Sequence, residues 1–325
     1  MKYLLRHLGL YLVAIWVSLT LNFLLPRTMP GDPVSALIGR MHGKFTPEQI
    51  DAIRKAYGFT NAPLLQQYFQ YLSHVVTGDF GISISAYPAK VSSIISTALM
   101  WTILLGVVTL FLSFVLGTVL GVIVAWRRGG FLDSVMPSLF NFIGSFPYFF
   151  LAMLALFILG FTLNWFPMAH AYSDLLSPGF SWPFIGSVAF HLILPAGTVI
   201  LVSIGGWLIG MRSTMIAVLS EDYIVMAEAK GLPQWQVMFN YAMRNAILPN
   251  FTQFGMSIGF ILGGQILTEI VFSYPGLGFY LVRAVTAHDY PLMQALFLMI
   301  TLAILIANLI VDLLYVRLDP RVRTA

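Results

Sequence analysis

The sequence lacks cysteine altogether and has very little charge. Without thiols, disulfides, zinc–thiolate sites and cysteine nucleophiles are all excluded. The 325 residues include only 17 Lys or Arg and 13 Asp or Glu, or 9%, against about 25% in soluble domains. Hydrophobic residues make up 58% of the chain, which is more than a soluble fold of this size can shield from water. These numbers argue against a soluble fold, exclude disorder and indicate a polytopic membrane protein.

The scarcity of charge also limits the chemistry that the chain can carry. The net charge of +4 is small for this length and is typical of anchoring at a membrane surface. We therefore expect the basic residues to lie at the surface of the lipid bilayer and to bind no nucleic acid. The six His are scattered and carboxylates are few, so we expect no metal site and no catalytic residue.

Long uncharged runs predict six membrane-spanning helices. A helix that crosses the hydrocarbon core needs about 20 mostly apolar residues. The first run follows Lys2 and Arg6 like a signal peptide, but no small-residue cleavage pattern ends it, so we interpret it as an uncleaved anchor. The fold class is therefore an all-α polytopic membrane protein, with spans at about 8–27, 97–126, 134–163, 189–212, 250–273 and 291–316.

The loop charges predict the orientation. With the N-terminus inside, ten basic residues are cytoplasmic, while the short external loops at about 164–188 and 274–290 hold only Arg283. We therefore predict a multi-pass protein with both termini in the cytoplasm. Its expected parts are the N-terminus with the first span (1–27), an external segment (28–96), a five-helix core (97–316) and a cytoplasmic tail (317–325).

The external segment has helical patterns of its own. Pro at a first turn favours a short helix over Pro47–Tyr57. The apolar residues of 64–76 recur at helical spacing among polar ones, which predicts an amphipathic helix that ends at Gly78. We therefore expect a small helical cap on the external face.

The cytoplasmic loop 213–249, between the fourth and fifth spans, predicts a helix–turn–helix. Ser220 can cap the start of a helix, and the carboxylates of Glu221 and Asp222 interact favourably with the positive N-terminal end of that helix. Gly231 ends that helix, and a second one runs from Gln234 to Ile247. A bent loop with small side chains at its turn can fit a groove on another protein, or it can be an ordinary connector that packs on its own membrane domain.

The same loop resembles the coupling loop, or EAA motif, of ABC-type importer permeases, and most closely that of dipeptide and oligopeptide permeases. Asp222-Tyr223-Ile224, Ala227 to Leu232 and Arg244 to Pro249 match the family pattern, whereas Met226 and Glu228 depart from it where the family often has Thr and Arg. The resemblance implies an ATPase-coupling loop made of Glu221, Asp222, Tyr223, Ala227, Glu228, Ala229, Lys230, Gly231, Leu232 and Pro233.

Four further segments resemble the family in the right order. They are Pro30 to Pro33, Gly78 to Ser83, Glu269 to Gly278 with Asp289 to Pro291, and Leu318 to Arg323. The resemblance implies a bacterial or archaeal inner-membrane importer with a second homologous permease, two ATPase subunits that carry ATP and Mg, and a solute-binding protein. The solute it implies is an oligopeptide; an oligosaccharide, such as a cello-oligosaccharide, stays an alternative.

Residues of the third and fifth spans are candidates for the translocation path. The third span is interrupted at Phe146, Pro147 and Tyr148. The backbone groups freed there can line a cavity, or the interruption can be a kink that serves packing alone. Gln253, Gln265 and Glu269 are polar residues of the fifth span. We expect Glu269 near the external end, within reach of water, where it serves the path or a structural hydrogen bond. Gly117 and Gly121 have the spacing of close helix packing.

The chain itself offers no nucleotide site. The segment from Gly39 to Lys44 is one residue short of a phosphate loop, and Phe45 stands where Ser or Thr belongs. We therefore expect any ATP to be bound by a separate subunit. An ion-coupled secondary transporter remains the main alternative, although the spans lack mid-span charge; a membrane-embedded enzyme would need a catalytic constellation that is not visible.

Overall fold

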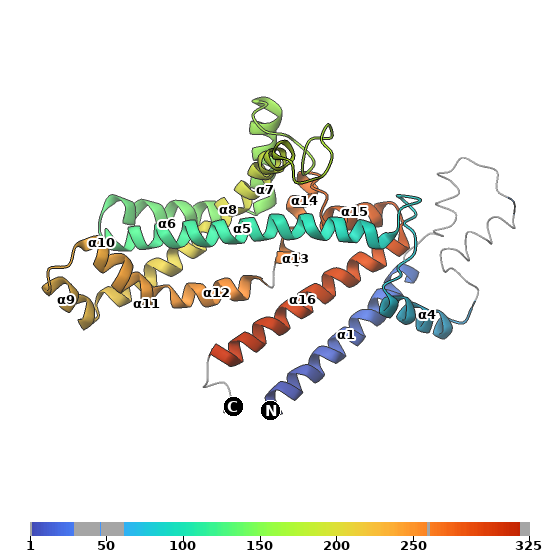
Figure 1. Cartoon of the computed structure of the whole chain (residues 1–325), viewed down its shortest axis with the longest axis horizontal. Helices are drawn as coiled ribbons and strands as arrows, with labels where there is room; N and C mark the ends of the chain where they lie inside the picture. The colour runs from blue at the N-terminus through green and yellow to red at the C-terminus, as the bar shows by residue number, and fades with distance from the viewer. Residues whose placement is uncertain (1, 29–45, 47–61, 259–260, 319–325) are drawn as a thin grey trace. The chain divides into compact units, whose positions relative to one another are not determined.

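The computed structural model describes residues 2–28, 46, 62–258 and 261–318, and this part of the chain is helical (Figure 1). Within it, the β-type pairing is one isolated bridge between Ile82 and Lys90. The helices form two compact units, residues 1–102 with 275–325, and residues 103–274. The prediction of an all-helical fold is confirmed, while the predicted helix Pro47–Tyr57 lies outside the described residues.

The first unit contains α1 (Lys2–Thr28), α4 (Leu64–Thr77), the start of α5 (Val91–Trp126), α15 (Leu277–Thr286) and α16 (Tyr290–Leu318). Helix α1 packs along α16, and the Asn22 side chain donates to the Gln294 carbonyl at 2.7 Å. Helix α4 is the predicted amphipathic helix, and it ends at Gly78 with a φ of +69°. The Tyr68 hydroxyl joins it to Thr20 of α1 at 2.9 Å.

Asp289 holds a second part of this unit together. Its Oδ2 accepts hydrogen bonds from the hydroxyls of Ser83 and Ser85 and, at 2.8 Å, from the Ser85 backbone N–H. Its Oδ1 accepts the N–H of Leu292 at 3.2 Å, which caps the start of α16. The two sequence segments around Ser83 and Asp289, about 200 residues apart, therefore meet at one buried carboxylate.

The second unit contains the rest of α5, from Ile103 on, and the remaining helices. They are α6 (Phe131–Gly144), α7 (Tyr148–Ala155), the π-helix η1 (Leu156–Thr162), α8 (Trp182–Leu219), α9 (Asp222–Ala229), α10 (Gln234–Gln236), the π-helix η2 (Val237–Met243), α11 (Arg244–Ala246), α12 (Leu248–Ile258), α13 (Ile261–Gly264) and α14 (Ile266–Val271). Helix α8 packs closely on α5 and α6. A Cβ atom at Gly121 would lie 2.6 Å from the Leu208 carbonyl oxygen, and one at Gly205 would lie 2.9 Å from that of Phe140. The close packing predicted for Gly121 is confirmed.

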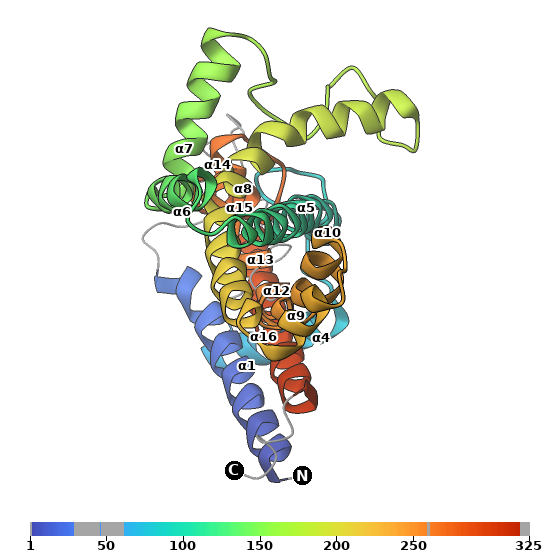
Figure 2. The ribbon, with the colours of Figure 1, turned by 90° about the vertical axis from the view of Figure 1, so that its left-hand side faces the viewer.

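Three described helices are long and apolar enough to cross a membrane: Val91–Trp126, Trp182–Leu219 and Tyr290–Leu309. A fourth span is possible if α6 and the helix Tyr148–Thr162 count as one, although they meet at 91°; Figure 2 shows α7 turning away from α6. The third predicted span is therefore not a straight helix, and the fifth is interrupted at Gln265, between α13 and α14. Six spans remain a prediction.

Candidate functional site

The segment 220–233 forms a helix followed by a tight turn. Glu221, with an extended backbone, precedes the first residue of α9, and Asp222 stands in the first turn. The expectation that Ser220 caps this helix is wrong, because its hydroxyl donates back to the Ala217 carbonyl at 2.7 Å and so closes the end of α8 instead. Gly231 has a φ of +73°, and its N–H donates to the Glu228 carbonyl at 2.9 Å, which is how glycine ends a helix.

A second helical arm follows this segment and runs from Gln234 to Ala246, close to the predicted Gln234–Ile247. It has a wider π-helical turn over Val237–Met243 that the sequence did not indicate. The two arms are tied together, since the Asn245 amide donates to the Tyr223 hydroxyl at 2.9 Å. We call residues 220–246 the hairpin.

A buried apolar cluster fixes the hairpin to the ends of two long helices. Ile224 and Ala227, one turn apart on α9, are both buried. They share this cluster with Met211 and Met215 of α8, and its remaining members are Val122 and Ala125 of α5 and Val237, Ala242 and Ala246 of the second arm. The hairpin cannot shift without moving the ends of α5 and α8 or opening this core.

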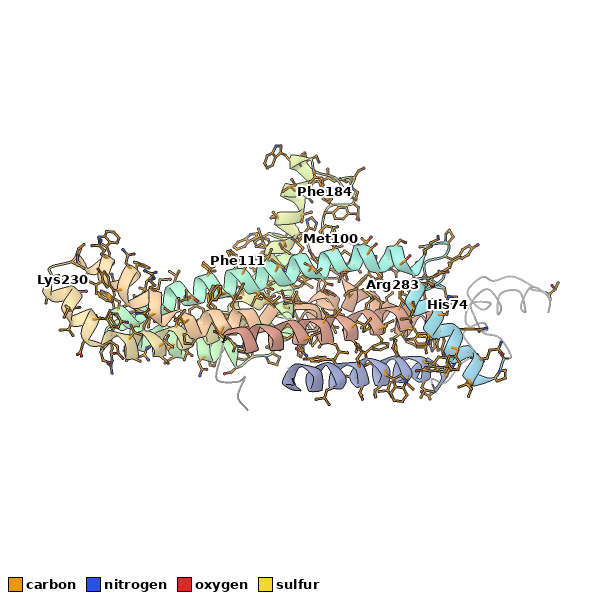
Figure 3. All side chains as sticks on the ribbon, turned by 60° about the horizontal axis from the view of Figure 1, so that its bottom comes forward. His74, Met100, Phe111, Phe184, Lys230 and Arg283 are labelled. Carbon is orange, nitrogen blue, oxygen red and sulfur yellow. The ribbon has the colours of Figure 1, made fainter. Side chains whose placement is uncertain are left out.

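The outer surface of the hairpin carries most of the residues predicted for coupling. Figure 3 shows Lys230 at the tip. The hairpin also exposes apolar side chains, since Met226 and Trp235 are each 61% exposed. Of the predicted residues, Ala227 is buried and Leu232 is partly buried, so these two hold the hairpin in place; the exposed ones are Glu221, Asp222, Tyr223, Glu228, Ala229, Lys230, Gly231 and Pro233.

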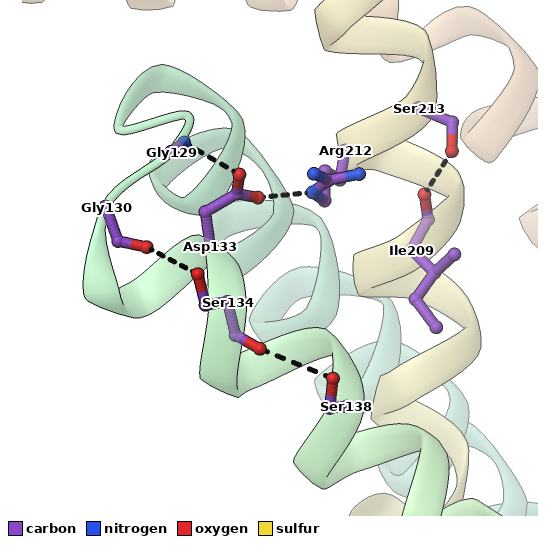
Figure 4. A network of polar contacts seen from close by, with 8 residues as sticks. All are labelled: Gly129, Gly130, Asp133, Ser134, Ser138, Ile209, Arg212 and Ser213. Atoms are coloured by element: carbon purple, nitrogen blue, oxygen red, sulfur yellow. Dashed lines mark hydrogen bonds and ion pairs between the residues drawn. The ribbon is translucent and has the colours of Figure 1, made fainter.

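An ion pair that was not predicted lies beside the cluster. Asp133, in the first turn of α6, accepts a hydrogen bond from Arg212 Nε of α8 and one from the Gly129 N–H at 2.9 Å (Figure 4). The Arg212 hydrogen bond, followed by the Gly129 one, lowers the pKa of the Asp133 carboxyl below its usual range. Arg212 adjoins Met211 of the cluster, so one turn of α8 contacts both the hairpin and α6.

The predicted path residues fall into two groups. Phe146 and Pro147 lie at the bend before α7, and Tyr148 is the first residue of α7. Helix α7 packs against α14, which carries Glu269 and follows Gln265. Gln253 lies apart from them on α12 and is exposed.

The expectation that water reaches Glu269 is wrong, because this residue is only 1% exposed. Tyr274, three residues after the end of α14, donates its backbone N–H to the Glu269 carbonyl at 2.8 Å. Burial first, and the Glu269 charge second, raise the pKa of the Tyr274 phenol. Glu269 therefore belongs to the packed interior, where sequence position alone placed it at a wet helix end.

The described part of the chain contains no group of three or more His, Asp or Glu that could hold a metal ion. What it offers is a rigid, partly apolar hairpin at one end of long apolar helices. Such an arrangement can bind another protein and transmit a displacement.

Comparison with known families gives the class of this protein. Residues 117–324 match the family described as "Binding-protein-dependent transport system inner membrane component". Residues 1–115 match its N-terminal region, described as "Binding-prot-dependent transport system membrane comp, N-term". The chain therefore belongs to this family of ABC transporter permeases, which are membrane transport subunits.

Individual relatives are similar over nearly the whole chain. The Dipeptide transport system permease protein DppB of Lactococcus lactis subsp. cremoris is 34% identical over 324 residues, covering 99% of both chains. The protein of the same name from Escherichia coli K12 is also 34% identical, again over 99% of both chains. The Oligopeptide transport system permease protein AppB of Bacillus subtilis is 33% identical over 303 residues, or 93% of each chain.

Proposed function

We propose that this chain is a permease subunit of an ATP-driven importer of short peptides in a bacterial or archaeal inner membrane. The observation that carries the proposal is the exposed hairpin fixed to the ends of α5 and α8, in a chain whose full-length relatives are named as dipeptide and oligopeptide permeases. Because these names refer to peptides, we favour peptides over oligosaccharides as the solute.

The proposed topology has six spans and both termini in the cytoplasm. The bent pair α6–α7 with η1 would form the third span, and α12, α13 and α14, with their break at Gln265, would belong to the fifth. The segment 28–96 would be external and the hairpin cytoplasmic, as the loop charges favour.

The hairpin would dock on one of two partner ATPase subunits, which bind ATP and Mg. Its exposed surface supports a protein contact, because it includes the apolar Met226 and Trp235 as well as the charged Glu228 and Lys230. When the ATPases move, the buried cluster would carry the displacement into α5 and α8, and the Asp133–Arg212 pair would carry it into α6. The helices would thereby alternate between inward and outward access.

The path would run between this chain and a second, homologous permease, and a solute-binding protein would deliver the peptide from outside. Gln253 supports this, because an exposed amide within a span is costly against lipid and favours a partner or water. Gln265 and Glu269, with Phe146, Pro147 and Tyr148 near the bend, would contribute from the packed side of α14 and α7.

The substitution Gly231→Trp tests the docking role, with Gly129→Trp as a matched control. Both glycines have positive φ, +73° and +78°, and at both a Cβ atom would meet nothing within 4 Å, so the backbone strain is alike. Only Gly231 lies on the proposed docking surface. We expect Gly231→Trp to abolish peptide uptake and ATPase retention in a pull-down while the protein still inserts, and Gly129→Trp to keep both. Equal behaviour of the two variants would identify the hairpin as a plain connector.

A further inference from the structure

One face of α5 consists of glycine and small hydroxyl residues over four turns. Its members recur every three or four positions, which places them on one side of the helix: Gly106, Thr109, Ser113, Gly117 and Gly121. A Cβ atom at Gly106 would overlap the Ile261 side chain of α13, and one at Gly117 would lie 2.8 Å from the Ile204 carbonyl oxygen of α8. This stripe is therefore the surface on which α8 and α13 pack.

One hydrogen bond links the stripe to the residue that precedes α14. Gln265, in the break between α13 and α14, donates its Nε2 to the Thr109 hydroxyl at 3.3 Å. Thr268 follows Gln265 by three residues, on the neighbouring turn. Among the described residues, no hydrogen-bond partner is found for three buried oxygens of this region: Ser113 Oγ, Gln265 Oε1 and Thr268 Oγ1.

The unpaired hydroxyls of Ser113 and Thr268 differ from other Ser and Thr hydroxyls in the helices of this chain. Ser and Thr in membrane helices ordinarily donate to the carbonyl three or four residues earlier. Thr109 does so to Gly106 at 3.0 Å, as do Ser145 to Asn141 and Ser257 to Gln253. Ser113 and Thr268 do not, although both are at least 99% buried. Buried polar groups without partners are rare and call for a ligand or a second state.

We propose that Ser113, Gln265 and Thr268, each within one helical turn of the Thr109–Gln265 hydrogen bond along the chain, form an intramembrane site for an uncharged hydrogen-bonding group. None of the four is ionisable, so a neutral group fits: an ordered water or a peptide amide of the solute. The site fills when α13 and α14 shift along the small-residue stripe, which the break at Gln265 permits. The inference rests on the proposed function, and it adds the stripe of α5 as a wall of the path.

The cysteine-free chain allows a direct test with Ser113→Cys in the complex with its partners in membrane vesicles. The control is Phe111→Cys, within one turn on the same helix and 53% exposed on its outer side (Figure 3). The probe is a charged methanethiosulfonate, which reacts with thiols in water. We expect Ser113→Cys to react at least about tenfold faster during ATP turnover than at rest, and Phe111→Cys to stay slow in lipid. Slowing by alanine tripeptide would identify the amide as occupant; no slowing would identify water.

A thiol at 113 that stays inert in every state, in vesicles that import peptide, would overturn the inference while leaving the proposed function intact. A second pair of variants guards against faulty assembly. Ser113→Ala and Thr268→Val remove unpaired hydroxyls, so the melting temperature should not fall. Peptide uptake should drop about fivefold or more, because a hydrogen bond to the occupant is lost. Unchanged uptake in both would also contradict the site. Failure of wild-type uptake would instead count against the proposed function.

Discussion

Replacement of Asp289 by alanine should destabilise the protein by about 2–4 kcal/mol. The carboxylate is fully buried and accepts hydrogen bonds from Ser83, Ser85 and Leu292. Loss of the cap on α16 costs about 1 kcal/mol. The buried N–H and hydroxyl donors left behind cost about 1–3 kcal/mol more, partly relieved because hydroxyls can rotate.

Asp79→Ala is the matched control, because Asp79 is an exposed acid of the same segment, and its one hydrogen bond within the described residues is local, from the Gly81 N–H at 3.2 Å. Melting of the detergent-purified chain, followed by the fluorescence of its seven Trp, would measure both. A loss of 2–4 kcal/mol corresponds to roughly 4–10 °C for Asp289→Ala, and Asp79→Ala should stay near the wild type. Equal melting temperatures for the two variants would refute the reasoning that Asp289 joins the two segments.

Three further predictions follow from the packing, the ion pair and the topology. Gly205→Ala should lower stability by about 1–3 kcal/mol, because its Cβ would meet a backbone carbonyl of α6, whereas Gly206→Ala, with open space, should be neutral or stabilising in a melting assay. Because folding lowers the pKa of the Asp133 carboxyl, the ionised carboxylate stabilises the fold at pH values above its ordinary pKa near 3.9. The difference in melting temperature between wild type and Asp133→Asn should therefore shrink as the pH falls from about 3.9 through the folded-state pKa. In intact cells, an impermeant thiol reagent should label Thr77→Cys and spare Ser213→Cys; the reverse pattern would invert the topology.

Local patterns predicted the helices and the turn of the hairpin well. Uncharged runs set the long helices, and Gly231 with its neighbouring proline marked the bend because few other residues adopt positive φ. Pro147 indicated an interruption of the third span. The 91° angle between the two helices at that point depends on how α6 packs on α8 and how α7 packs on α14. Such packing between distant segments leaves no local periodicity in the sequence.

The missed polar contacts have the same cause. Asp133 and Arg212 are 79 residues apart, and Ser83 and Asp289 are 206 apart. Each residue is visible in the sequence as an isolated polar group beside an apolar run, but its partner is set by the fold. Glu269 was misjudged for a related reason, since its burial depends on neighbours that the uncharged run before it does not reveal.

The central claim is that separate ATPases drive transport through the hairpin of this chain. It is tested most directly by uptake of labelled peptide into proteoliposomes that hold the purified complex with ATP inside and the loaded solute-binding protein outside. We predict that uptake and hydrolysis require both ATP and the partner ATPases, persist when ionophores collapse all ion gradients, and are absent with this chain alone. Hydrolysis by the isolated chain, or uptake driven by an ion gradient without ATP, would contradict the claim.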